Sequence, residues 1–328
     1  MRVSRPGHGA VLAFTSSGMA GLYNRSSNYT GSETAANLNS GNATAVTVKA
    51  KWTALTIFDL TYMQEMTPTI CNNTTTPNVS ATAIINSHSA DKTKVPRTTL
   101  VDSRDNLVYE VSKLADGNCW MTTKNLRLHK AMTLNSSNSD LPSGTTFNML
   151  ACNTFSGSYS NAECLRGSTT LYDYWEESHG DFYNFLAATA GTGTGSSGVA
   201  SGTICPKGWT IPPDGLASNK SFSNLFLNYY TGKTWETVGD EPLSFVGSSF
   251  IWGLSPQTGS NTVGNHSNNP QRGDYWEKTI WDSTHAHRLY WGSNGLYGIE
   301  LEIAGYDHGM LLHDWSKTEG FTIRCVSK

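Results

Sequence analysis

Apolar and polar residues alternate with a period of two in three parts of the chain, which is the pattern of a half-buried β-strand. The runs are AVTVKAKW at residues 45–52, LVYEVS at 107–112 and FTIRCV at 321–326. The turn residues RDN at 104–106 precede the second run. We therefore expect a hairpin strand over 107–112 and a buried final strand over 321–326.

A helical period is clear over residues 221–230. Apolar side chains there follow the spacing i, i+3, i+4, i+7 from Phe222 to Tyr229, and Gly232 provides a stop. Strands and helix do not alternate as they would in βαβ units, which argues against a doubly wound sheet. The pattern predicts an α+β fold with more strand than helix and long connecting loops.

Composition divides the chain into three parts. Residues 1–53 are polar, rich in Gly, Asn and Ser, and close on the first alternating run, which predicts a small β module or its remnant. Residues 54–97 are interpreted as a linker or long loop with a leading strand, because 72–91 consists largely of polar residues such as Thr and Asn. Residues 98–328 then form the main domain.

Charge and hydropathy narrow the classes of function. The 328 residues include 23 Lys and Arg against 26 Asp and Glu, a net charge of −3, so bulk attraction to nucleic acid is absent. No apolar run approaches the ~20 residues that cross a bilayer. The apolar patch at 10–14 is short and lacks a clean cleavage site, so we do not interpret it as part of a signal peptide. We expect neither a nucleic-acid partner nor a membrane span in this chain.

The cysteines form no CxxC or CxxH pair, which argues against a zinc ribbon or a thioredoxin-type site. An even number in a chain rich in Thr and Asn fits disulfides, an oxidising compartment and a secreted or cell-surface protein. The alternative is a cytoplasmic protein with six buried thiols. The six are Cys71, Cys119, Cys152, Cys164, Cys205 and Cys325.

Four blocks after residue 98 resemble the bacterial "major paralogous domain" (FISUMP) family. They are GNCWM at 117–121, ICPKGWTIP at 204–212, GDYW at 273–276 and GFTIRCV at 320–326. Each block alone is weak, but together they are specific. The resemblance implies a C-type-lectin-like fold, in which the first and last strands pair and a long irregular loop region carries the binding face.

Domains of this type also serve as variable proteins of diversity-generating retroelements, in which a segment near the C-terminus is hypermutated for ligand binding. The resemblance places that segment at about residues 277–319, between the Tyr-Trp block and the final strand. The family usually reads Tyr-Trp-Ser-Ser-Thr there, whereas this chain has Glu277 and Lys278 in place of the serines. Such a departure fits a diversified segment, and ordinary drift in one paralogue is the alternative.

The resemblance also implies a cysteine pairing. Simpler members of the family keep Cys205 and Cys325 but lack a cysteine before the Trp of the first block, so those two are expected to pair with each other. The other expected bridges join Cys71 to Cys119 and Cys152 to Cys164. The last of these would close a local loop worth about 3 kcal/mol in the chain-entropy model.

The window 277–319 and its flanks concentrate Trp, Tyr and His, which give binding surfaces large, stiff contact area at low entropy cost. We assign Trp276, Leu289 and Trp291 to the core, the first because it belongs to a framework block. Trp281 lies in a turn-rich stretch and is expected to be exposed.

Alternation with Leu289 turns Arg288 and Tyr290 outward. The resulting hypothesis is a ligand-binding face in which a few aromatic side chains supply most of the affinity and charged ones tune specificity. Its expected members are Glu277, Lys278, Ile280, Trp281, His285, His287, Arg288, Tyr290, Tyr297, Tyr306, His308 and Trp315.

Other motifs are weaker. The GxGxxG match at 193–198 has no strand before it and no helix after it, so a flexible loop is favoured over a nucleotide site. His285 and His287 share a strand face and could reach a metal, but histidine-rich binding surfaces arise without one. Glu176 and Glu177 are adjacent, and adjacent carboxylates more often solvate a surface than form a glycosidase pair. We predict no metal, no cofactor and no catalysis.

The leading hypothesis is a surface or secreted protein that binds a protein or cell-surface ligand through a diversified face. The runner-up is an adhesive or structural surface protein of the same fold without diversification. The third candidate is an enzyme related to formylglycine-generating enzymes, which share the lectin-like fold and use reactive cysteines. It is disfavoured because Cys205 and Cys325 lie in blocks that resemble structural core.

Overall fold

A computed structural model of the chain divides it into two compact units, residues 1–56 and 57–328, which are treated separately here. In a few strands only the backbone is described. Side chains are described at residues 54–75, 95–114, 116–128, 130–152, 155, 157–167, 176–213, 220–222, 224–225, 273–289 and 315–328.

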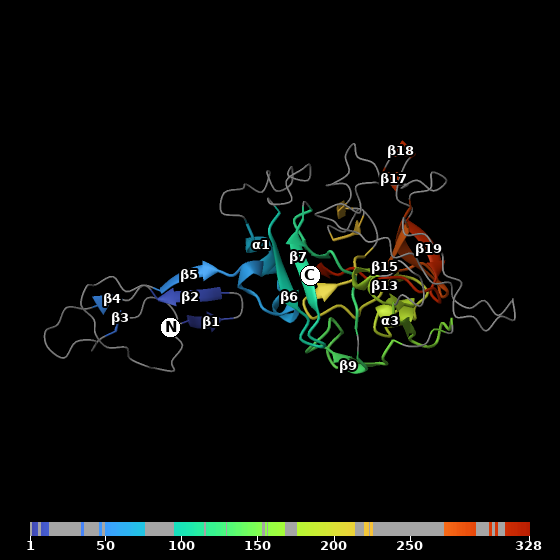
Figure 1. Cartoon of the computed structure of the whole chain (residues 1–328), viewed down its shortest axis with the longest axis horizontal. Helices are drawn as coiled ribbons and strands as arrows, with labels where there is room; N and C mark the ends of the chain where they lie inside the picture. The colour runs from blue at the N-terminus through green and yellow to red at the C-terminus, as the bar shows by residue number, and fades with distance from the viewer. Residues whose placement is uncertain are drawn as a thin grey trace. The chain divides into compact units, whose positions relative to one another are not determined.

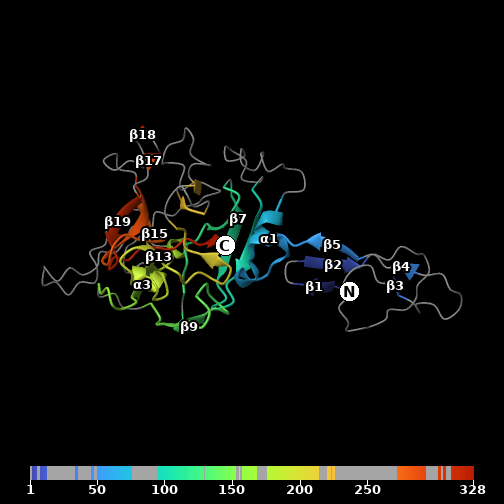
Figure 2. The same cartoon turned by 180° about the vertical axis from the view of Figure 1, so that it is seen from behind.

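Unit 57–328 is drawn in Figure 1 from α1 onward and, from behind, in Figure 2. In unit 1–56 the described elements are backbone strands. Three of them form an antiparallel sheet in the order β1-β2-β5, and β3 pairs with β4. The alternating run at 45–52 is thus divided between β4 and β5, which belong to different sheets. The strands are β1 (Arg2–Arg5), β2 (His8–Leu12), β3 (Thr34–Ala35), β4 (Val46–Thr47) and β5 (Ala50–Ala54).

A five-stranded sheet in the order β14-β20-β8-β7-β6 forms one part of unit 57–328. Its strands are β6 (Arg97–Val101), β7 (Val108–Lys113), β8 (Cys119–Thr122), β14 (Trp209–Thr210) and β20 (Val326–Ser327). The expected hairpin strand is confirmed, because β7 pairs antiparallel with β6 across the turn that joins them. Tyr109 and Val111 point inward and are buried, while Val108 is 47% exposed.

A four-stranded antiparallel sheet in the order β13-β15-β16-β19 forms the other part. Its strands are β13 (Gly198–Val199), β15 (Arg272–Ile280), β16 (His285–Gly292) and β19 (Leu312–Ser316). Shorter antiparallel pairs are β9 (Met132–Asn135) with β10 (Thr146–Met149), β11 (Cys164–Leu165) with β12 (Phe182–Tyr183), and β17 (Glu302–Ile303) with β18 (Tyr306–Asp307).

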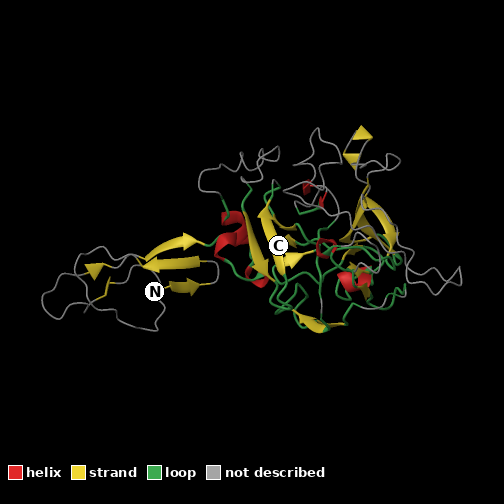
Figure 3. Ribbon diagram, in the orientation of Figure 1, coloured by secondary structure: helices red, strands yellow, loops and turns green. Residues whose placement is uncertain are grey.

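Helices are short throughout the described part of the chain (Figure 3). They are α1 (Pro68–Asn73), α3 (Phe185–Ala188) and the 3₁₀ turns η1 (Ile57–Asp59), η2 (Met63–Glu65) and η4 (Glu177–His179). The helix expected over 221–230 does begin at its predicted start, where Ser221 Oγ accepts a hydrogen bond from the Asn224 N–H at 3.0 Å. Residues 226–230 lie outside the described residues.

The predicted α+β class, and with it the C-type-lectin-like fold class, is therefore wrong: this is a mostly β protein built from antiparallel sheets. The two α-helices whose bounds the structure gives, α1 and α3, have six and four residues. The sequence contains only one clear helical period. A single predicted helix does not justify a fold class with substantial helix content.

Segment 320–327 runs between the two main sheets. Its beginning bridges to Tyr183 of β12 and Tyr275 of β15, and its end, β20, lies between β8 and β14. Every residue of the segment is buried. The expected final strand is buried, as predicted. Regular strand is limited to β20, because Phe321 and Thr322 bridge to Tyr183 and Tyr275 and not to the neighbours of β20.

Arg324 is the buried cation of this segment. It has no exposed surface, and its guanidinium donates hydrogen bonds to Asn125 Oδ1 at 3.1 and 2.9 Å and to the Met121 carbonyl at 3.1 Å. The guanidinium also lies 5.8 Å from the centre of the Tyr275 ring. Burial lowers the pKa of Arg324. These bonds connect segment 320–327 to the end of β8.

Three disulfides tie unit 57–328 together, in the pairing that the family resemblance implies. One joins α1 to β8, one joins the chain before β14 to segment 320–327, and one closes a local loop before β11. They are Cys71–Cys119, Cys205–Cys325 and Cys152–Cys164.

Asp116, in the turn before β8, provides a test of pH dependence. Its carboxylate accepts hydrogen bonds from Trp120 Nε1 at 2.8 Å and Asn118 Nδ2 at 2.9 Å, but burial outweighs them and raises its pKa from 3.8 to about 6. A raised pKa means that the folded chain binds the proton more tightly than the unfolded one. The stabilisation from Asp116 is therefore complete below pH 3.8 and is lost as the pH rises through about 6.

We expect Asp116→Asn to flatten the fall in the free energy of unfolding across that pH range. Urea denaturation at stepped pH measures this for both chains, and other titrating groups cancel in the comparison. Parallel curves for the two proteins would show that Asp116 does not titrate in this way.

Candidate functional site

The hairpin of β15 and β16 has a tip, residues 281–284, that is closed by one side chain. Asp282 Oδ1 accepts hydrogen bonds from the backbone N–H groups of Thr284 and His285, both at 2.6 Å. These N–H donors hold the pKa of Asp282 well below its usual range. Because an ionised acceptor strengthens such bonds, the tip has a defined conformation.

Trp281 presents a large apolar surface on this tip. Its side chain is 57% exposed, and its ring centre lies 5.4 Å from that of His287. His285 and His287 are two residues apart on β16 and so share one face of the strand. An exposed indole supported by an imidazole is a preformed surface for contact with a ligand.

Two residues from distant parts of the sequence extend this surface. Val199 of β13 is 54% exposed and pairs with Thr279, which lies two residues before Trp281 in the sequence. Tyr159 is 49% exposed, and its hydroxyl lies 3.2 Å from Oγ of Ser316, the β19 residue opposite His285.

We call this surface the aromatic face and define it as Tyr159, Val199, Trp281, His285 and His287. The predicted exposure of Trp281 is confirmed, and so is the predicted burial of Trp276 and Leu289. Sequence reasoning missed Tyr159 and Val199, because neither lies in the window 277–319 and only strand pairing brings them to it.

The opposite face of β16 is buried. Arg288 is 4% exposed, forms an ion pair with the fully buried Asp274, and places its guanidinium carbon 4.2 Å from the centre of the Trp315 ring. The expectation that Arg288 points to solvent is therefore wrong. Alternation correctly placed Arg288 and Leu289 on opposite sides, but both sides of the sheet are covered here, and Asp274 offsets the cost of burying the charge.

Other predicted members of the binding face are also buried. Glu277 has no exposed surface and Ile280 is 6% exposed, so neither can contact a ligand directly. Lys278 is half-buried and donates a hydrogen bond from Nζ to Thr210 Oγ1 at 3.0 Å, and burial lowers its pKa. Trp315 is half-buried and lies on the Arg288 side of the sheet.

The remaining predictions fall on residues whose side chains the structure does not describe. Tyr290 and Trp291 lie in β16 and Tyr306 lies in β18, each as backbone. Tyr297 and His308 lie outside the described residues altogether.

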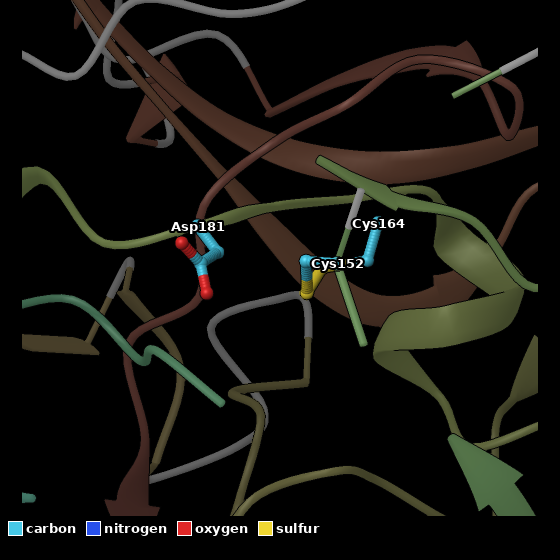
Figure 4. Close-up of side chains that lie close together, drawn as sticks. All are labelled: Cys152, Cys164 and Asp181. Carbon is cyan, nitrogen blue, oxygen red and sulfur yellow. A yellow bond between two sulfur atoms is a disulfide. The ribbon is translucent and has the colours of Figure 1, made fainter. Parts of the chain in front are cut away.

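The GxGxxG match at 193–198 leads into the edge strand β13, and the carbonyl oxygen of its Gly195 accepts a hydrogen bond from Lys317 Nζ at 2.9 Å. Within the described residues, the potential metal-ligating side chains that cluster are Cys152, Cys164 and Asp181 (Figure 4). Their two sulfur atoms are joined in a disulfide, which removes both as ligands in this form.

No protein-family model, curated protein or solved structure matches this chain. Among the residues that the structure describes, none of the helices has the length and apolar character needed to cross a bilayer.

Proposed function

We propose that this chain is a secreted or surface-displayed binding protein that recognises a protein or cell-surface ligand through the aromatic face. The observation that carries the proposal is Trp281, a mostly exposed indole at the tip of a hairpin whose conformation Asp282 fixes. Preorganisation matters because a ligand then does not have to supply the free energy of ordering the tip.

The buried layer beneath the aromatic face supports the same function. Arg288, Asp274 and Trp315 pack against one another on the other side of β16, so substitutions on the exposed side leave this packing intact. A binding protein whose specificity changes needs this separation between a constant interior and an exchangeable exterior. The β15–β16 hairpin has this separation between its two sides.

We further propose that the exposed positions are diversified by a retroelement, as the resemblance to the major paralogous domain family implies. Variation would then concentrate at Trp281, His285 and His287 and spare the buried Glu277 and Ile280. The test is the DNA beside the coding region, which should contain a near-identical repeat differing at adenines, together with a reverse transcriptase. Without both, the proposal reduces to a surface protein of fixed specificity.

We also propose an extracellular location, because of the disulfides. Three disulfides form in unit 57–328, and disulfides persist in oxidising compartments.

We expect Trp281→Ala to weaken ligand binding by about 30-fold, because a central exposed aromatic contributes about 2 kcal/mol to such an interface. The probe is the fluorescently labelled full-length chain titrated onto intact bacterial and animal cells in a flow cytometer. Leu150→Ala is the matched control, since Leu150 is 75% exposed but lies outside the aromatic face. Saturable binding that Trp281→Ala leaves unchanged would exclude this face as the binding surface.

A further inference from the structure

Asp181 carries a buried carboxylate with one unsatisfied oxygen. The residue has no exposed surface, and its Oδ1 accepts a hydrogen bond from the Gly167 N–H at 3.1 Å and lies 3.4 Å from Arg127 Nε. Oδ2 is also buried, and no group among the described residues forms a hydrogen bond with it. Leaving such an oxygen unpaired is costly, so its surroundings are informative.

The nearest sulfur chemistry is the disulfide Cys152–Cys164. One ligand atom from each of Cys152, Cys164 and Asp181 lies within 4.8 Å of the other two. Cys164 begins β11 and pairs with Tyr183 of β12. Asp181 is the residue before β12, so this strand pairing holds its carboxylate beside the sulfur atoms (Figure 4).

These distances are close to those of a tetrahedral metal centre. Zn²⁺ binds thiolate sulfur at about 2.3 Å and carboxylate oxygen at about 2.1 Å, so its ligand atoms lie about 3.6 Å apart. The carboxylate and sulfur atoms would have to approach by about 1 Å at most, and the sulfur atoms would have to separate after the bond between them breaks. The two cysteines are 12 residues apart in the sequence, so the bridge closes a short loop.

This disulfide is also the one most open to a reductant. Cys152 and Cys164 are 3% and 7% exposed, whereas the other four cysteines are at most 2% exposed. A small surface pocket lined in part by Met149, Leu150 and Cys164 lies beside this bridge. Mild reduction should therefore open Cys152–Cys164 before the other two bridges.

We propose that reduction of Cys152–Cys164 creates a binding site for one thiophilic divalent cation such as Zn²⁺, with two thiolates and the Asp181 carboxylate as ligands and a fourth position open to water. A phosphine and water supply the two electrons and two protons that convert the S–S bond into two thiols, leaving the phosphine oxide. The cation then displaces the two thiol protons. Arg127 remains on Oδ1 and offsets part of the negative charge of the three ligands.

The dithiol form is not exotic, because every copy of the chain passes through it before its disulfides form. A cation held at this position would fix the start of β11 near Asp181 during that period. It would also delay oxidation of the pair, since metal-bound thiolates are protected from disulfide exchange.

The experiment uses the full-length chain after mild phosphine reduction, with thiol alkylation and mass spectrometry to establish which bridge has opened. Cd²⁺ is then titrated while the ultraviolet thiolate-to-cadmium charge-transfer absorption is followed, and native mass spectrometry with Zn²⁺ gives the stoichiometry. We expect one cation per reduced chain and none for the oxidised chain or for Cys152→Ser/Cys164→Ser.

Asp181→Asn should weaken cation binding at least tenfold, whereas Asp140→Asn should leave it unchanged. Asp140 is the matched control because its Oδ2 is likewise buried and forms no hydrogen bond within the described part of the chain, but the residue does not belong to the cysteine cluster. Near-ultraviolet circular dichroism of the oxidised variants checks that each is folded. Equal affinity for the Asp181 and Asp140 variants, or binding that survives loss of both cysteines, would overturn the proposal.

Discussion

Replacement of Arg324 by methionine is expected to lower the free energy of unfolding by about 3–5 kcal/mol. Methionine fills much of the volume but leaves Asn125 Oδ1 and the Met121 carbonyl, which together accept three hydrogen bonds from Arg324, without that donor in a dry interior. Because domain stabilities lie at about 5–15 kcal/mol, this single change removes a large share of the total.

Urea denaturation of Arg324→Met and of Lys207→Met, an exposed cation with no such role, measures the effect. We also expect Asn125→Leu/Arg324→Met to be more stable than Arg324→Met alone, because the double variant no longer buries the unpaired amide oxygen. If Arg324→Met cannot be obtained folded, Arg324→Lys provides the graded case, since lysine keeps the charge but cannot form the guanidinium fork. A loss below about 1 kcal/mol would contradict the expectation.

Removal of the bridge Cys205–Cys325 by paired serine substitution is expected to cost about 5 kcal/mol, the largest loss among the three bridges. It closes a sequence separation of 120 residues, against 48 for Cys71–Cys119 and 12 for Cys152–Cys164. In the chain-entropy model the latter two are worth about 4 and about 3 kcal/mol.

Thermal and urea denaturation of the three paired serine variants tests this ranking. The short loop serves as the internal control, because its bridge restricts the unfolded chain least. A greater loss on removing Cys152–Cys164 than on removing Cys205–Cys325 would show that folded-state contacts, and not loop closure, dominate the contribution of these bridges.

The sequence predicted those features whose environment is set by residues nearby in the chain. The alternation at 107–112 gave the correct strand and the correct inward face, and the framework block gave the buried Trp276. The turn-rich composition around Trp281 correctly indicated exposure. In each case the neighbouring residues in sequence are also the neighbours that determine the environment.

The errors arose where a residue's environment comes from distant segments. Alternation cannot tell that β16 is covered on both sides at Arg288 and Leu289, so Arg288 was expected in solvent although Asp274 and Trp315 enclose it. The same limitation affected Glu277 and Ile280. The prediction of the fold class was wrong for a different reason: the one helical period at 221–230 received more weight than the many short strands.

The position of segment 320–327 has a consequence for biosynthesis. β20 separates β14 from β8, so neither strand can complete its pairing before residues 326–327 have left the ribosome. Co-translational folding of the five-stranded sheet is therefore limited to the β6-β7-β8 meander. The aromatic residues of the later strands emerge while their final partners are still unsynthesised, so apolar side chains and unpaired strand edges stay exposed until synthesis of this sheet is complete.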